Sequence, residues 1–169
     1  MTALHIADTG LFVAMGQPSN TRFQAVERFA HRNEITFQLP ERVYGELTTD
    51  ETTGSTPPVD AAIEAGWASI AAPLNFSNPI VSRVMDGVQR YIANVDDRPA
   101  DEVEQADGAL AALAAQHLSA GAVNDVYIYT TDVAAGEGAE TILDAEGYGD
   151  AVTFVDGFRF LEDLISASG

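Results

Sequence analysis

The sequence predicts a three-layer α/β/α sandwich with a mostly parallel central sheet, formed by one domain over residues 1–169. Short apolar segments alternate along the chain with segments whose apolar residues recur at helical spacing. This alternation favours a parallel sheet covered by helices on both faces. The first apolar segment, residues 4–7, shows no polar alternation, as is typical of a central strand buried on both sides. Hydrophobic residues make up 46% of the chain, which is enough for a packed core and argues against disorder.

Five short apolar segments are the expected strands. The first ends before Asp8 and Thr9, either of which can cap the helix that follows. The third is closed by Pro73, which cannot continue a ladder of backbone hydrogen bonds. We expect strands at residues 4–7, 35–39, 67–71, 126–129 and 152–155.

The expected helices lie between and after these strands, and their apolar residues repeat at intervals of three or four. Pro40 stands in the first turn of one of them, where its missing N–H costs nothing. Residues 48–58, rich in Thr, Gly, Pro and acid, are expected to form a loop, either a flexible segment over a site or a linker. We expect helices at residues 11–15, 20–31, 40–47, 59–65, 80–93, 101–118, 134–145 and 158–165.

The charge of the chain is strongly negative, with 26 acidic and 8 basic residues and a net charge of −18. All eight basic residues are arginines, and the acids are spread over the predicted helices and loops. Such a surface repels itself at ordinary ionic strength, whereas in about 1 M salt the Debye length falls to roughly 3 Å and the repulsion is screened. An acidic, lysine-free chain with a regular apolar pattern is typical of a halophilic protein.

The missing residue types exclude several classes of protein. Without cysteine there are no disulfides, thiolate metal sites or cysteine nucleophiles. Without lysine there is no Walker A loop, and receiver domains and most haloacid-dehalogenase-type phosphatases are disfavoured. With no signal peptide and no apolar run of about 18 residues, we expect a cytoplasmic protein with no membrane contact.

Four acids stand at positions that suggest chemistry. Asp8 and Asp132 follow strands, and open α/β sheets place their sites at the carboxyl ends of their strands. Asp8 and Asp132 can equally be helix caps. Asp107 falls on the expected inward face of helix 101–118, where an unpaired carboxylate costs several kcal/mol. A shared metal ion, an Arg or a backbone N–H would compensate that cost. Glu104, one turn earlier, and Glu46, beside two apolar helix positions, can be further carboxylates or ordinary surface acids.

Four segments of the chain, in order, resemble the motifs of the PIN-domain family, and together they span nearly the whole sequence. They are residues 6–12, 39–47, 106–114 and 128–132. The resemblance implies a nuclease in which Asp8, Glu46, Asp107 and Asp132 surround one or two Mg²⁺ or Mn²⁺ ions. Compared with compact members of that family, the segment at about 48–99 is extended. Asp125 is an alternative fourth acid, although it begins its strand.

Carboxylate oxygens are the ligands that hard divalent cations prefer, and Mg²⁺ usually takes a few of them together with water and substrate phosphate. Thr9 and Thr131 are placed either to hydrogen-bond these carboxylates or to cap helices. Nucleic-acid binding normally rests on Lys and Arg contacts to phosphates, and eight arginines are few. Arg22, Arg28, Arg32 and Arg42 form either one local basic rim or dispersed partners of acids.

The leading hypothesis from the sequence is a metal-dependent endoribonuclease, either a toxin-like RNase or an RNA-processing enzyme. The alternatives are a PIN-fold scaffold without useful activity and a metal-dependent phosphatase acting on small phosphoesters. The partners implied are an RNA substrate, an antitoxin or RNA-processing protein, and a second copy of the chain in a homodimer.

Overall fold

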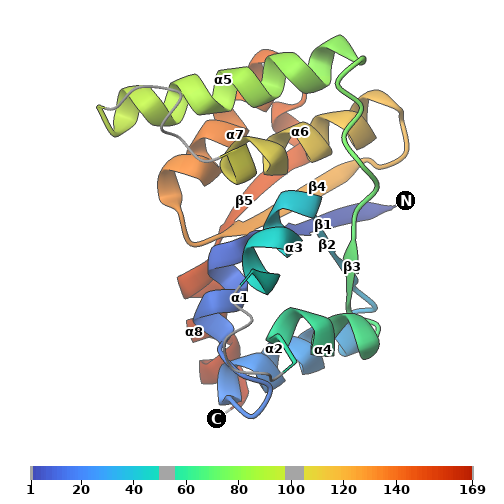
Figure 1. The fold of residues 1–169 in the computed structure, drawn as a ribbon, viewed down its shortest axis with the longest axis vertical. Helices are drawn as coiled ribbons and strands as arrows, with labels where there is room; N and C mark the ends of the chain where they lie inside the picture. Colours follow the sequence, from blue (N-terminus) through green and yellow to red (C-terminus); the bar gives the residue numbers. More distant parts are fainter. Residues whose placement is uncertain (1, 50–55, 98–104, 169) are drawn as a thin grey trace.

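The computed structural model describes residues 2–49, 56–97 and 105–168, and its centre is a five-stranded, all-parallel sheet (Figure 1). The strand order is β3-β2-β1-β4-β5, so β1 is the middle strand, as its uninterrupted apolar sequence predicts. All five predicted strands are confirmed. Their bounds are β1 (Ala3–Ala7), β2 (Phe37–Leu39), β3 (Ala68–Ile70), β4 (Asp125–Thr130) and β5 (Val152–Asp156).

Helices cover both faces of the sheet and complete the predicted α/β/α sandwich (Figure 1). On one side, α1 (Thr9–Met15), α2 (Thr21–Arg32) and α8 (Gly157–Ser168) pack on one another. On the other side, α6 (Gln105–Ser119) and α7 (Val133–Ala145) lie on the strands, and α5 (Pro79–Val95) lies over both of them. The remaining elements are α3 (Glu41–Thr48), which contacts α1 and α6, α4 (Pro58–Glu64) and the short 3-10 helix η2 (Gly149–Ala151). No helix in the described ranges has the length and apolarity that a membrane span requires.

One face of the sheet carries aromatic rings. His5 pairs in register with Phe37 on one neighbouring strand and Tyr127 on the other, and it stacks on Tyr127 at 5.0 Å between ring centroids. Its Nδ1 lies 2.8 Å from the hydroxyl of Tyr129. Burial lowers the pKa of His5 below its usual 6.5 and so favours the neutral ring. Phe160 of α8 packs edge-on against Tyr129 and joins this face to the helical layer below it.

The opposite face is covered by α6, whose middle part is buried on every side rather than along one face. Every residue from Ala109 to Ala115 is at most 1% exposed. The sequence analysis expected one inward face that included Leu110, Leu113, Ala114 and Leu118; these four are buried, but so are Ala109, Ala111, Ala112 and Ala115 on the other sides of the helix. The physical reason is that α6 lies between the sheet and α5, and its many alanines allow both neighbours to approach. Residues 101–104, the predicted start of this helix, lie outside the described residues.

Because all strands are parallel, their carboxyl ends meet at one edge, where α1, α3, α7 and α8 begin. The chain is packed tightly there. A Cβ at Gly10 would overlap the hydroxyl oxygen of Thr131, and a Cβ at Gly157 would lie 2.9 Å from the Cγ2 of the same threonine. The starts of α1 and α8 are therefore held against the turn between β4 and α7.

Candidate functional site

Asp8, directly after the central strand, is the most enclosed acid of this edge. It is 5% exposed, and its backbone N–H donates to the carbonyl of Tyr129 at 3.0 Å, which holds it between β1 and β4. Its Oδ1 accepts the N–H of Thr9 at 2.7 Å as the cap of α1, and its Oδ2 accepts the hydroxyl of Thr130 at 2.7 Å. Both carboxylate oxygens of Asp8 therefore accept a hydrogen bond, one as a helix cap and the other from a buried hydroxyl.

Asp132 is joined to Asp8 through Thr130, a fully buried residue. The Thr130 hydroxyl donates to Asp8, and its oxygen accepts the backbone N–H of Asp132 at 3.1 Å. Asp132 also caps α7, since its Oδ1 accepts the N–H of Ala135 at 3.2 Å. One threonine therefore fixes the ends of two adjacent strands relative to each other.

Glu46 is joined to Asp8 through Thr9. The Thr9 hydroxyl donates to Oε2 of Glu46 at 2.7 Å, while its backbone N–H donates to Asp8. The predicted role of Thr9 as a partner of a carboxylate is confirmed. Glu46, Thr9, Asp8, Thr130 and Asp132 thus form one hydrogen-bonded series, which we call the threonine-linked acids.

The structure places the other predicted residues as follows. Asp107 lies half-buried in the first turn of α6, a helix that contacts both β1 and α3. Glu104 lies outside the described residues. Asp125 begins β4 and is exposed at the opposite, amino end of the sheet, so it is not an alternative fourth acid. The threonine hydroxyl that reaches Asp8 belongs to Thr130, whereas that of Thr131 lies beside Gly10.

Two residues of this edge were missed from the sequence. Asp156 is the last residue of β5, pairs in register with Thr130, and caps α8 by accepting the N–H groups of Phe158 at 3.0 Å and Arg159 at 3.2 Å. Its signal was available, because it directly follows a predicted strand. For Thr130 the sequence carries no such signal, because threonines are mostly exposed and nothing in the sequence marks this one as buried.

The donor set suits a hard divalent cation. Within the described residues, no three acidic or histidine side chains stand close enough together to hold a metal ion between them. Mg²⁺ does not need three such side chains, because it is usually held by one or two carboxylates together with water and substrate phosphate. Asp8 also has an outer shell of the kind that orients metal ligands, with an N–H and a hydroxyl each holding one carboxylate oxygen.

A comparison with protein families identifies the family to which this fold belongs. The halobacterial PIN domain model matches residues 1–168. The chain belongs to the halobacterial PIN domain family. Neither a curated protein nor a solved structure gave a match. PIN domains are nuclease-type folds that generally act on RNA and typically use divalent metals, and this PIN domain carries its acids at the sheet edge where such a site would lie.

Proposed function

We propose that this PIN domain is a metal-dependent endoribonuclease that hydrolyses RNA phosphodiester bonds with Mg²⁺ or Mn²⁺. The observation that carries the proposal is the series of threonine-linked acids at the carboxyl edge. There, Thr9 links Asp8 to Glu46, and the hydroxyl of Thr130 links Asp8 to the backbone N–H of Asp132. Asp107, at the start of the helix that crosses β1, is proposed as the fourth acid.

In this proposal each residue of the series has a definite task. Asp8 and Asp132 present carboxylate oxygens from rigid strand ends, and Glu46 presents one from α3. The neutral hydroxyl groups of Thr9 and Thr130 hold these acids in position and do not bind the metal themselves. A divalent cation held by these acids would supply the positive charge that stabilises the phosphodiester transition state. The exposed position of Glu46 leaves room at the outer side of the series for the RNA backbone.

The test is a cleavage assay on the purified chain with a structured and a single-stranded RNA, in molar KCl containing Mn²⁺ or Mg²⁺. High salt is chosen because the net charge of −18 is screened there. We expect internal cleavage that EDTA stops and added metal restores. Absence of cleavage would favour a scaffold, and turnover of small phosphomonoesters without RNA cleavage would favour a phosphatase; either result contradicts the proposal.

Replacing Thr130 by Val is expected to lower the cleavage rate by about 10- to 100-fold, the usual cost of losing an outer-shell partner. Valine has a similar shape but lacks the hydroxyl, so Asp8 loses a donor and the N–H of Asp132 loses its acceptor. The control is Thr130→Ser, which keeps the hydroxyl and should retain most of the activity. Because the site is buried, rates are compared well below the melting temperature of each variant. Equal rates for the Val variant and the parent would show that this hydroxyl does not position the site.

A further inference from the structure

A cavity of about 340 Å³ opens at the same sheet edge as the threonine-linked acids, on the side of β2 and β3. It is lined by Pro40, which directly follows β2, by residues 72–74, which follow β3, and by Ala109 and Leu113 of α6. Neighbouring strands lie about 4.8 Å apart. Because β2 adjoins β1, and β3 adjoins β2, the cavity is on the order of 5 to 10 Å along the edge from Asp8. This is the reach of a single nucleotide.

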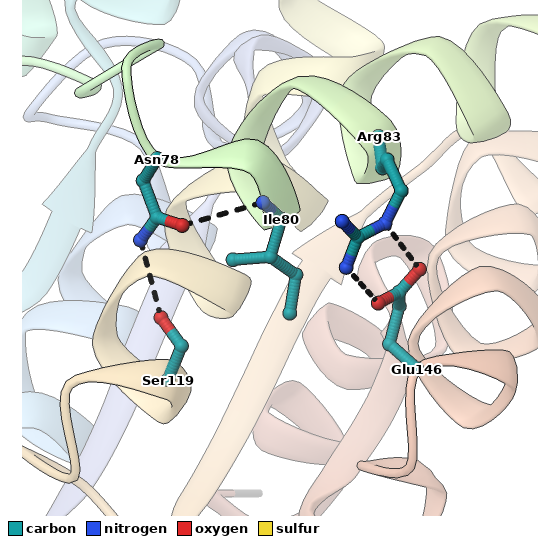
Figure 2. A network of polar contacts seen from close by, with 5 residues as sticks. All are labelled: Asn78, Ile80, Arg83, Ser119 and Glu146. Atoms are coloured by element: carbon teal, nitrogen blue, oxygen red, sulfur yellow. Dashed lines mark hydrogen bonds and ion pairs between the residues drawn. The ribbon is translucent and has the colours of Figure 1, made fainter.

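The outer wall of the cavity is held in place by hydrogen bonds. Gln116 of α6 donates to the carbonyl of Pro73 at 3.3 Å and accepts the N–H of Asn75 at 2.7 Å. Figure 2 shows the next attachment, where Asn78 bonds the N–H of Ile80 at the start of α5 and reaches Ser119 of α6 at 3.5 Å. A second attachment of α5 is the ion pair between Arg83 and Glu146 at 2.7 Å (Figure 2). Glu146 directly follows α7, so this pair links α5 to the end of α7.

This attached wall presents an exposed aromatic ring. Phe76 is 56% exposed although its backbone carbonyl is fixed by the hydroxyl of Ser82 at 3.1 Å. It lines the cavity together with Leu74 and Pro73. An exposed ring on a fixed backbone loses little conformational freedom when a ligand stacks on it.

Arg42 supplies a positive charge at the opposite wall. It is exposed on the first turn of α3, one turn before Glu46 and therefore on the same side of that helix. Within the described residues, no acid forms an ion pair with it. The other three arginines of the expected basic rim, Arg22, Arg28 and Arg32, lie on α2 beside α8, apart from the cavity. Arg42 is thus a cation on a strongly acidic protein, beside an acid of the proposed site.

We propose that this cavity binds the nucleotide next to the phosphodiester bond that is cleaved, as part of a single-stranded stretch of the RNA substrate. Its base stacks on Phe76 over Leu74, and its phosphate contacts Arg42. Splayed bases that stack on aromatic side chains, with Arg on the backbone, are the usual way in which proteins hold single-stranded RNA. Glu41, which also lines the cavity, offers acceptor oxygens for the N–H groups at the edge of a base. The inference rests on the proposed function and adds to it a substrate subsite.

The test separates binding from cleavage by measuring fluorescence anisotropy of a labelled single-stranded RNA with the full chain in EDTA. Phe76→Ala and Phe76→Leu should weaken binding about 5- to 150-fold, as loss of one stacked base does, whereas Phe76→Trp should retain it. The Leu variant keeps an apolar surface, so it distinguishes stacking from a general apolar contact. Arg42→Ala should reduce the slope of log K against log salt by about one. Arg90→Ala, an exposed arginine of α5, is the matched control and should change neither quantity.

The outcomes separate this inference from the proposed function. A parent chain that binds and cleaves RNA, with Phe76→Leu binding equally well, would overturn the subsite and leave the nuclease assignment intact. Weaker binding by the Phe76 variants, without cleavage by the parent, would support the nucleotide subsite and overturn the nuclease assignment. A parent that neither binds nor cleaves RNA would overturn both.

Discussion

Changing Asp8 to Asn is expected to lower metal-dependent RNA cleavage by about 100-fold or more, with the fold retained. The reason is that Asn keeps the size and one acceptor oxygen of the side chain but removes the negative charge at the centre of the threonine-linked acids. Loss of a residue that only orients a metal ligand typically lowers activity about 10- to 100-fold. Loss of a proposed ligand itself should therefore lower the cleavage rate by about 100-fold or more. The measurement is the initial rate of RNA cleavage in molar KCl with Mn²⁺.

The matched control for this variant is Asp125→Asn. Asp125 is exposed at the amino end of β4, at the opposite edge of the sheet from Asp8. Its replacement by Asn removes the same single negative charge. It should leave the rate unchanged. If Asp8→Asn cleaves as fast as the parent, the activity belongs to another site or to a contaminating nuclease, and the proposed site is wrong.

Changing Trp67 to Ala is expected to lower the free energy of unfolding by about 3–5 kcal/mol, the usual cost of removing a large buried aromatic side chain. Trp67 is 1% exposed and contacts three other rings, among them Phe23 at 5.2 Å and Phe37 at 6.3 Å between centroids. Its indole N–H donates to Glu27 of α2 at 3.2 Å, so it joins the start of β3 to the helical layer. Because whole domains are stable by only about 5–15 kcal/mol, this variant should be close to unfolding.

The control is Trp67→Phe, which keeps an aromatic ring and loses the indole N–H. It should cost roughly half as much or less, since a single hydrogen bond contributes about 0.5–1.5 kcal/mol. Both variants are measured by urea unfolding in molar KCl with far-UV circular dichroism, because they lack the only tryptophan of the chain. A midpoint for Trp67→Ala equal to that of the parent would show that the aromatic cluster does not stabilise this layer.

The positions of Asp8 and Asp132 could be predicted because they depend on local rules. Each follows an apolar segment and precedes a helix, so each falls at a strand end with capping chemistry. In a parallel sheet such positions share one edge whatever the order of the strands. Glu46 and Asp107 were harder to place, because helical periodicity assigns a residue to a face but does not say what covers that face. In α6 even this assignment fails, since residues 109–115 are all buried.

The fold class, the central place of β1, the sheet edge that holds Asp8 and Asp132 and the absence of thiol or lysine chemistry all follow from the sequence alone. These follow from periodicity, strand composition and residue types, which act over a few residues at a time. That Thr130 joins Asp8 to Asp132, and that Arg42, Leu113 and Phe76 line one cavity, became visible only once the chain was folded. Those contacts join residues far apart in the chain, and their distances are set by how α1, α6 and the segment after β3 pack on the sheet. Packing of this kind depends on the whole core and cannot be read from any one segment.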